Sequence, residues 1–522
     1  MKRIMHSVIL LMPLIFCVLS VSYGFETGIK KAIVKIYSTQ TRPIFDKPWH
    51  FGTPEQASGS GCIINRNRIL TNAHVVSDHT FVQVCRYGES KKYKAKVVVV
   101  SHETDLALLT VEDKELFKGV KPLSIGELPN VQEEVVVYGF PEGGETICLT
   151  RGVISRIEHQ EYAHSLKHFL AIQIDAAINP GSSGGPALTN GKIIGVIMQA
   201  MPDSENIGYI VPTPIINHFL KDLEDGIYDG FPEDGIIIQA MENKDLKKMY
   251  GLKENESGVL VTSVIPGSPS EGIIKPRDVI MSIDGHDIAD DGTVEFRSDE
   301  RTSNDYFVQQ HQIGEKISLE ILRNGEKKKL LVTLTKPSGN LSLVAKPQYD
   351  IPPTYFIFSG LVFSPLTEDY LKVWANELEK YSPKDLIAYY TDSYLSVQGE
   401  EVINMINVLP HDVNNGYHNM SDCIIKEVNG KKVHNLKELI QIVENDSEGK
   451  FIEFKTKKNK YIVLDREKAA EAHAEILEIY GVTADRSFDL QVAGTGKQQL
   501  NVEYGKKIQT EFSQEAYLTK QR

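Results

Sequence analysis

Cysteine is scarce in this chain, with 5 among 522 residues, and no two of them form a CxxC pair. A zinc ribbon and a thioredoxin-type redox site both need such pairs, so the sequence argues against both kinds of site. The cysteines beyond the first 24 residues are widely scattered: Cys62, Cys85, Cys148 and Cys423. A chain of this length can bury a core without covalent cross-links, so we expect lone buried thiols rather than disulfides.

Blocks of basic residues are also missing, and the formal net charge is −13. A protein that binds a nucleic-acid backbone needs clustered Lys and Arg, so nucleic acid is not an expected partner. The sequence contains no phosphate-binding P-loop, which fits an activity that does not require ATP. It contains no cluster of metal-ligating residue types with suitable spacing, so we expect neither a metal nor another cofactor.

Long apolar runs are limited to one, Val8–Val21, close to the N-terminus. The run follows Lys2 and Arg3 and precedes Ser22-Tyr23-Gly24, a pattern typical of a secretory signal peptide over residues 1–24. At about 14 residues it is shorter than the roughly 20 that a spanning helix needs. We therefore expect an exported protein, periplasmic or secreted, with no stable membrane span after cleavage. An uncleaved N-terminal anchor is the alternative.

Short β-branched runs separated by turns fill most of residues 25–225, with KAIVKIY, KAKVVVV, EEVVVYGF and KIIGVIMQA as examples. Many short strands with regular turn signals predict an all-β barrel or sandwich. The segment TPIINHFLKDL, at residues 213–223, has apolar residues near helical spacing and predicts a helix at the end of this domain.

The rest of the chain divides into a second domain at 235–338, a Pro-containing linker at 339–356, a third domain at 357–485 and a polar tail at 486–522. In the third domain DCIIKEVNG parallels DVIMSIDG of the second, which indicates a divergent internal repeat. Within the second domain, Asn324-Gly325 predicts a tight turn between two strands.

Three polar residues follow one another in an order used by serine hydrolases. RILTNAHVV places His74 directly after a predicted strand, and TDLALLTV places Asp105 at the head of another. Ser183 comes last, within DAAINPGSSGGPAL. A serine that transfers an acyl group needs a base within hydrogen-bond reach and a third group that orients the base. The order His, Asp, Ser is the chymotrypsin-type order.

Other interpretations of these residues exist. GSSGG also satisfies the GxSxG pattern of α/β-hydrolases, but Pro186 and a predicted strand follow where that fold has a helix. Lys192 could form a Ser–Lys dyad, although its TNGK context is typical of a turn. Asp78 is a nearby competitor of Asp105, and a lone histidine or Gly-Ser run is more often structural.

The motifs TNAHVV, TDLALL, FPEGGETICLTRGVIS, DAAINPGSSGGPAL and NIGYIVPT resemble the HtrA/Deg family of serine endoproteases. Further along, GVLVTSV, DGTVEFR and FSGLVFSPLT resemble the plant-type Deg proteases, which carry one PDZ domain and a second, degenerate one. The resemblance implies a mainly β protein: a chymotrypsin-like double β-barrel followed by two α+β PDZ-like domains. It also implies a trimer-based homo-oligomer. One departure is Ser182, where the family usually has Asn.

The catalytic roles follow from this chemistry. Ser183 would attack the scissile carbonyl, His74 would carry the proton, and Asp105 would orient the imidazole. The backbone N–H groups of Gly181, Ser182 and Ser183 would stabilise the oxyanion.

Substrate preference is predicted from the strand after the nucleophile, Val196–Ala200, which is apolar apart from Gln199. We expect cleavage after small or medium apolar residues, namely Val, Ile, Ala or Leu.

The resemblance also implies peptide binding by the second domain. A PDZ domain adds an extended peptide to a strand and receives its terminal carboxylate in a loop of backbone N–H groups. That loop would lie at Gly235, Ile236 and Ile237 and would bind C-terminal peptides, while the third domain would be structural. The alternative is that Gly235 only begins a strand and receives no ligand.

The sequence therefore predicts an exported, ATP-independent serine endoprotease that degrades unfolded or damaged proteins in the cell envelope. An alternative from another class is a peptide-binding chaperone or scaffold with a mostly latent protease domain.

Overall fold

The computed structural model describes residues 28–142, 144–200, 207–336, 341–374, 383–391, 393–446 and 449–491. The predicted signal peptide, residues 1–24, lies outside these ranges. The chain forms two compact units, of which the first comprises the chain up to Gln40 together with Pro54–Leu223. The second comprises Thr41–Thr53 and the chain from Glu224 onward. Among the helices in the described ranges, none is long and apolar enough to cross a membrane.

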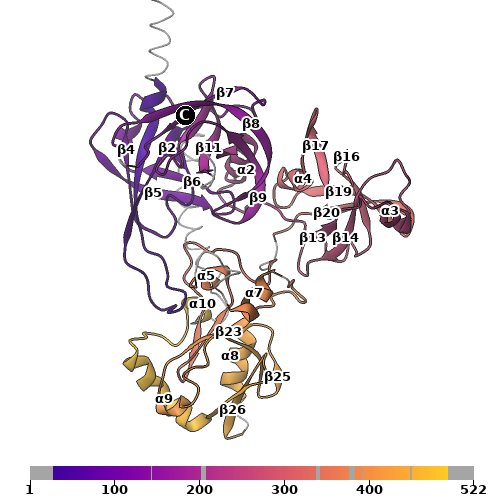
Figure 1. Cartoon of the computed structure of the whole chain (residues 1–522). Coiled ribbons are helices and arrows are strands. Elements are labelled where there is room, and N and C mark those ends of the chain that lie inside the picture. Colours follow the sequence, from indigo (N-terminus) through magenta and orange to yellow (C-terminus); the bar gives the residue numbers. More distant parts are fainter. Residues whose placement is uncertain are drawn as a thin grey trace, which may run out of the picture. The chain divides into compact units, whose positions relative to one another are not determined.

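The first unit contains two closed antiparallel β-barrels (Figure 1). In the first barrel the strand order is β1–β2–β3–β6–β5–β4. The bounds are β1 (Ile33–Gln40), β2 (Glu55–Ile64), β3 (Arg68–Thr71), β4 (His79–Arg86), β5 (Lys92–Ser101) and β6 (Leu106–Val111). Valine, isoleucine and leucine fill its interior because successive strand residues point to opposite faces.

The second barrel has the order β10–β11–β12–β9–β8–β7. Its strands are β7 (Glu134–Gly139), β8 (Cys148–Tyr162), β9 (Lys167–Ile174), β10 (Pro186–Thr189), β11 (Lys192–Ala200) and β12 (Gly208–Pro212). The predicted helix is present as α2 (Thr213–Asp222), with a proline in its first turn, where no backbone N–H is needed. The 3-10 helix η1 (Lys114–Phe117) lies between the barrels in sequence.

The four cysteines within the described ranges are free thiols, but most of them are not buried. Cys62 is buried, Cys85 and Cys423 are partly exposed, and Cys148 is exposed. The expectation of lone buried thiols therefore holds for Cys62, whose pKa burial raises to about 12. The other three lie on strands with one face toward solvent, where the short runs of sequence did not separate the two faces.

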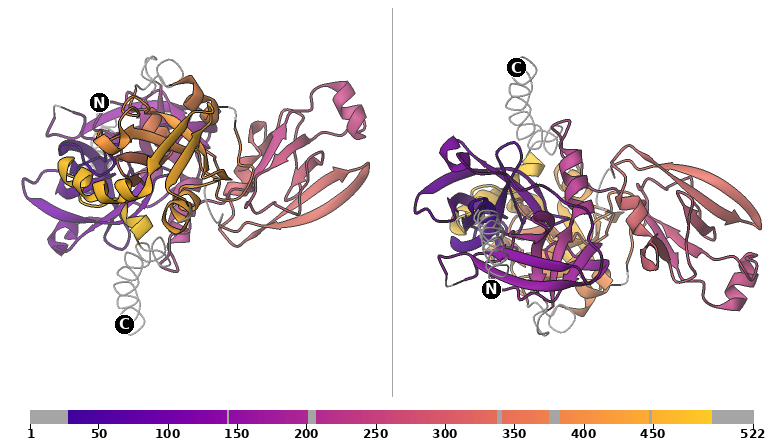
Figure 2. Two further views of the ribbon diagram at one scale, coloured as in Figure 1. Left: turned by 90° about the horizontal axis from the view of Figure 1, so that it is seen from below. Right: turned by 90° about the horizontal axis from the view of Figure 1, so that it is seen from above.

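The middle domain, predicted as residues 235–338, contains a sheet in the order β13–β14–β15–β19–β20, and β16 pairs with β15. Its elements are β13 (Ile236–Gln239), α3 (Lys244–Tyr250), β14 (Val259–Val264), β15 (Val279–Ile283), β16 (His286–Asp287), β17 (Thr293–Arg297), β18 (Glu300–Ser303), α4 (Asp305–Gln309), β19 (Lys316–Arg323) and β20 (Glu326–Thr333). The two long strands β19 and β20 lie side by side in both views of Figure 2. Asn324 and Gly325 both have positive φ at their turn, as the Asn-Gly signal predicts.

The C-terminal domain, predicted as 357–485, contains a sheet in the order β21–β22–β23–β24–β26–β27, and β25 pairs with β24. Its elements are β21 (Phe356–Phe358), β22 (Leu361–Pro365), α5 (Glu368–Leu371), α7 (Lys384–Thr391), β23 (Ile403–Val408), η2 (Asp412–Asn414), β24 (Cys423–Val428), β25 (Lys431–Lys432), α8 (Leu436–Asn445), β26 (Phe451–Thr456), β27 (Tyr461–Asp465), α9 (Arg466–Ile479) and α10 (Phe488–Gln491). Phe356 also pairs with Arg486, so ordered structure of this domain continues past residue 485 into the predicted tail.

The internal repeat is visible in the topology. DVIMSIDG forms β15 and its turn, and DCIIKEVNG forms β24 and its turn. Each strand is followed by a positive-φ pair and by a short strand that folds back onto it. The segments thus occupy equivalent places in their sheets, and β22 of the C-terminal domain corresponds to β13 of the middle domain.

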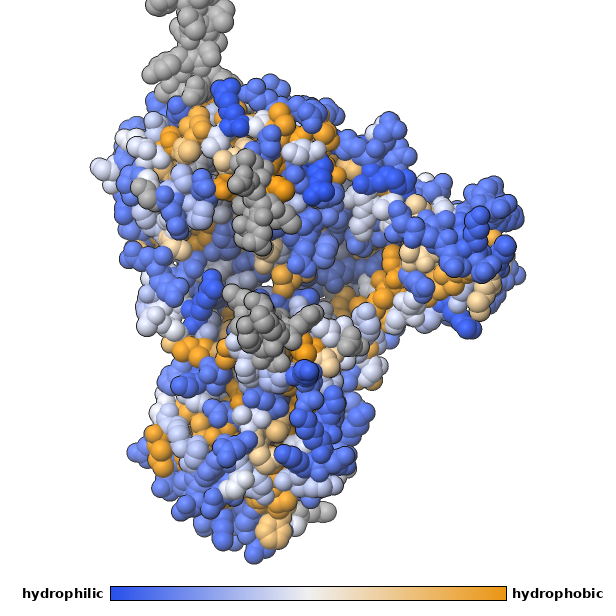
Figure 3. Space-filling model, viewed as in Figure 1, coloured by the Kyte–Doolittle hydropathy of each residue, from blue (hydrophilic) through white to orange (hydrophobic). Residues whose placement is uncertain are grey.

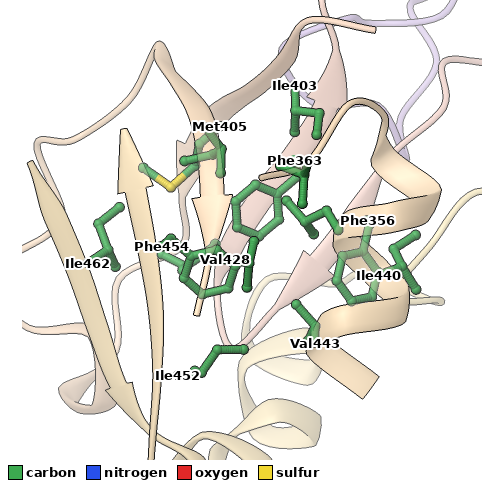
Figure 4. Close-up of a cluster of buried hydrophobic side chains, with 14 of the residues drawn as sticks. Phe356, Phe363, Ile403, Met405, Val428, Ile440, Val443, Ile452, Phe454 and Ile462 are labelled. Carbon is green, nitrogen blue, oxygen red and sulfur yellow. The ribbon is translucent and has the colours of Figure 1, made fainter. Parts of the chain in front are cut away.

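An aromatic cluster forms the centre of the C-terminal domain (Figure 4). Phe363 of β22 stacks on Phe454 of β26, with 5.2 Å between ring centroids. Phe356 of β21 packs with them on the same side as Ile440 and Val443 of α8. On the face in Figure 3, hydrophilic residues predominate and apolar residues are scattered between them, as is usual for a folded chain whose large side chains are mostly buried.

Candidate active site

His74 and Asp105 are brought together by the pairing of β3 with β6 in the first barrel. His74 follows the end of β3, Asp105 directly precedes β6, and Thr71 lies opposite Ala107 in the ladder. The His74 ring nitrogen Nδ1 lies 2.7 Å from Asp105 Oδ2, and the His74 backbone N–H donates to Asp105 Oδ1 at 2.9 Å. Asn72 Nδ2 donates to the Asp105 carbonyl at 2.7 Å, which fixes the turn.

Each member of the His74–Asp105 pair favours the charged form of the other. Burial lowers the pKa of His74, but the charge and hydrogen bond of Asp105 outweigh burial and leave the pKa raised. Burial raises the pKa of Asp105, yet the charge and hydrogen bonds of His74, with the charge of His164, leave that pKa lowered. The Asp105 side chain is 1% exposed and the His74 side chain 35% exposed, so the imidazole can reach a substrate while the carboxylate cannot.

Ser183 lies in a turn that is fixed against the first barrel. The Ser60 N–H of β2 donates to the Ser183 carbonyl at 2.8 Å, and Ser60 Oγ donates to the Gly181 carbonyl at 2.7 Å. Gly184 has φ of +83°, and a Cβ there would meet Ser60 O and Thr71 Oγ1 at 2.2 Å. Only glycine fits this approach. The turn is therefore held beside β2 and the end of β3, which leads to His74.

The three residues are not joined in one hydrogen-bonded chain. His74 and Asp105 are bonded, but no hydrogen bond links Ser183 Oγ to His74 among the described residues. The nucleophile–base bond of such sites is often long before substrate binds. A Cβ on Gly59 of β2 would meet Val75 at 2.6 Å and the Ser183 carbonyl at 3.3 Å, so this strand adjoins both the segment of His74 and the turn of Ser183.

Backbone donors in the Ser183 turn differ from the expectation at one position. The Ser182 N–H donates to the Asn179 carbonyl at 3.0 Å, because it closes the turn that begins at Asn179. Ser182 is therefore not available as a third oxyanion donor here, which corrects the sequence-based expectation. Gly181, with φ of +89°, and Ser183 are the two positions that remain.

The rival residues lie elsewhere. Lys192 is exposed at the β10–β11 turn, beside Asn190 and Gly191 with positive φ, and cannot serve as a buried base. His74 takes Asp105 rather than Asp78 as its carboxylate partner. In β11, Val196, Ile197 and Met198 are buried, and Gln199 Oε1 accepts the Ala163 N–H at 2.8 Å.

The predicted peptide loop opens the middle domain. Gly235 has φ of +72°, and β13 begins at Ile236. β13 is the first strand in the sheet order and pairs with β14, and no other described strand pairs with its second edge, which can therefore add a strand. The sequence missed one residue here: Asp234 Oδ1 accepts the Ile236 N–H at 3.0 Å. Because an Asp before a Gly is typical of turns, there was no reason in the sequence to assign Asp234 a role in the loop.

Comparisons with known proteins agree with this geometry. Residues 59–196 match the trypsin-like peptidase domain, and residues 250–334 and 344–489 each match a PDZ domain. Fold and matches together define a serine endopeptidase with a trypsin-like domain and two PDZ domains, as the sequence predicts.

Known relatives extend over most of the chain. The mitochondrial Protease Do-like 4 of Arabidopsis thaliana is 37% identical over 463 residues, covering 88% of this chain and 85% of that protein. The chloroplastic Protease Do-like 2 of the same plant is 40% identical over 472 residues, which cover 89% of this chain and 76% of that protein. A solved HtrA-type protease, AlgW with tripeptide, has 26% identity and a TM-score of 0.47, covering 60% of this chain and 95% of that one. The chain belongs to the HtrA/Deg family of serine proteases, as its motifs indicate.

Proposed function

We propose that this chain is an ATP-independent endopeptidase of unfolded or damaged proteins, with His74, Asp105 and Ser183 as its catalytic triad. The observation that carries the proposal is the His74–Asp105 pair, with its 2.7 Å contact and raised His74 pKa, beside the Ser183 turn fixed on β2. Nucleophile, base and orienting acid are the three roles that acyl transfer needs.

In the proposed reaction Ser183 Oγ bonds to the scissile carbonyl carbon, and its proton passes to His74. The imidazolium, stabilised by Asp105, then gives the proton to the leaving amine. Water releases the acyl group in a second step, again with His74 as the base. The N–H groups of Gly181 and Ser183 stabilise the oxyanion, and losing one such donor typically costs about 10²–10³ in rate.

Substrate preference is proposed from β11. Buried Val196, Ile197 and Met198 offer an apolar wall beside the nucleophile turn, and Gln199 is occupied by the 161–163 segment. This supports cleavage after Val, Ile, Ala or Leu.

Compartment and assembly belong to the same proposal. The N-terminal 24 residues support export to the cell envelope, although the related plant proteins are named as mitochondrial and chloroplastic. The family supports a trimer-based homo-oligomer. The middle domain supports binding of C-terminal peptides at Gly235, Ile236 and Ile237.

The first prediction concerns the nucleophile. The mature chain is expected to cut a reduced, unfolded protein without ATP, and Ser183→Ala is expected to reduce the rate by about 10⁶-fold, because the attacking oxygen is gone. Ser90→Ala, on the exposed surface of the first barrel, is the matched control. Fragments are followed by gel electrophoresis and mass spectrometry. Equal cleavage by the Ser183→Ala chain would contradict the proposal, and binding without cleavage by both would favour the chaperone.

A further inference from the structure

The amide donors at the start of the middle domain already have an internal partner. Asp234 Oδ1 accepts the N–H of Ile236 at 3.0 Å, across Gly235. The Ile236 N–H belongs to the loop that a peptide carboxylate would use, at the first residue of the open-edge strand β13. A side-chain carboxylate thus sits on a donor that a ligand carboxylate needs.

The same loop has hydrogen-bonding groups that are not satisfied within the described structure. Ser268 is 8% exposed and Ser270 is 0% exposed, and neither hydroxyl has a hydrogen-bond partner among the described residues. A Cβ on Gly235 would lie 2.5 Å from Ser268 Oγ, and the Ser270 N–H donates to the Asp234 carbonyl at 3.3 Å. Buried hydroxyls without partners are uncommon, and these two directly adjoin the loop, which points to a polar ligand group.

Charges around the loop oppose an anion. Burial raises the pKa of Asp234 to about 7, against the donation from Ile236 N–H, and the carboxylates of Asp305 on α4 and Glu233 raise it further. Asp305 is the first residue of α4, and Glu271 on the neighbouring turn accepts the Gly267 N–H. A second carboxylate in this place would meet like charge while Asp234 is ionised.

We propose that the ionised Asp234 carboxylate and the C-terminal carboxylate of a peptide exclude one another at the middle domain, so that this domain binds C-terminal peptides only while Asp234 is protonated. The inference rests on the proposed peptide site at Gly235, Ile236 and Ile237. Protonation removes the negative charge and weakens the hydrogen bond that Asp234 accepts from the Ile236 N–H. This N–H can then turn to the incoming carboxylate, together with the buried Ser268 and Ser270 hydroxyls.

The test measures binding of a fluorescein-labelled decapeptide ending in Val-Phe-Val to the full chain carrying Ser183→Ala, which prevents cleavage. The apolar end is chosen because Ile236, Ile238 and Phe307 pack on the apolar core of this domain and leave apolar surface partly exposed. Fluorescence anisotropy gives the dissociation constant at pH 6 and pH 8, and the C-terminally amidated peptide is measured alongside.

Because a pKa of about 7 lies between these values, the free-acid peptide is expected to bind about tenfold more tightly at pH 6 than at pH 8. Asp234→Asn is expected to bind it at pH 8 as tightly as at pH 6. Asp245→Asn, which removes an exposed carboxylate of α3, is the matched control and is expected to keep the pH dependence. The amidated peptide is expected to show no such dependence.

The outcomes separate this inference from the peptide site itself. Ile236→Pro removes the shared donor at a first strand residue, where proline is tolerated, and is expected to abolish free-acid binding. The parent could bind the free-acid peptide equally well at both pH values while Ile236→Pro does not bind it. That result would overturn the role of Asp234 and leave the peptide site standing. Absence of binding in every variant at both pH values would overturn both.

Discussion

At the scale of single residues, Asp105 directs both carboxylate oxygens at one neighbour. One oxygen accepts the His74 backbone N–H and the other faces the His74 ring. The bond to the backbone N–H fixes the position of His74. The contact with Nδ1 fixes the orientation of the imidazole ring and its tautomer. Asp105 itself has φ of +54°, a conformation that aspartate tolerates better than most residues, and Asn72 holds its carbonyl.

A pH prediction follows from this pair. His74 must be neutral to accept the Ser183 proton, so kcat/KM should fall as pH drops through the raised pKa of His74. Asp105→Asn removes the charge that raises this pKa. We expect kcat to drop about 10⁴-fold, with the acid limb of the profile at lower pH.

The profile is measured by initial rates of peptide cleavage between pH 5 and 9. Asp78→Asn provides the control, since the His74 ring bonds to Asp105. An acid limb that stays in place after Asp105→Asn would show that this carboxylate does not set the protonation of His74.

At the scale of elements, the two PDZ domains differ at one strand. In the middle domain no strand of the described ranges pairs with the outer edge of β13, but in the C-terminal domain the corresponding strand β22 pairs with β21 on that edge. Phe356 of β21 packs with Ile440 and Val443 of α8 (Figure 4). The short strand therefore lies where an added peptide strand would lie, which gives a physical reason for treating this domain as structural.

Removal of the Phe356 ring should loosen this arrangement. Phe356 is 2% exposed, and truncating a buried phenylalanine to alanine costs about 3–5 kcal/mol. We expect Phe356→Ala to reduce protection against hydrogen exchange in peptides from β21 to β24. Phe358→Ala in the same strand, where the ring is only partly buried, is the matched control and should have a smaller effect. Equal protection in both variants would contradict the account.

Much of this organisation could be predicted from the sequence, because strand runs, turn pairs and the His74, Asp105 and Ser183 motifs are local patterns. The engagement of the Ser182 N–H depends on a turn geometry that residue types do not specify. The strand β21 is only three residues long, too short to show a period, and its second contact, the bridge from Phe356 to Arg486, joins residues far apart in the sequence. The contact between Asp234 and the Ile236 N–H could not be predicted either. The pKa of Asp234 is raised by burial, and burial of this side chain cannot be seen from the residue type.

At the scale of the whole molecule, the compact units do not follow the order of the chain. Thr41–Thr53 connects two strands of the first barrel but belongs to the second unit. There Phe45 and Trp49 pack on the apolar core formed around Tyr355 and Ile357. Trp49 meets Tyr355 edge-on, with 6.0 Å between ring centroids.

Trp49 offers a spectroscopic test of this packing. The chain has 2 tryptophans, so Trp374→Phe leaves Trp49 as a single reporter. In that background Tyr355→Ala should move the Trp49 emission to longer wavelength and increase its quenching by iodide, because the ring loses an apolar neighbour. Tyr394→Ala, at a tyrosine that is 66% exposed, should leave the spectrum unchanged. A Tyr355→Ala spectrum equal to the parent's would contradict this packing.

The place of Thr41–Thr53 has a consequence for biosynthesis. The apolar neighbours of Trp49 are encoded roughly 300 residues further along the chain. At about 5–20 residues per second a ribosome needs about 15 to 60 s to reach them. Both barrels are synthesised during this interval while Phe45 and Trp49 still lack their partners. A nascent chain therefore carries an unpaired aromatic segment between its first two strands, at the stage when chaperone binding or premature association with a second chain competes with folding.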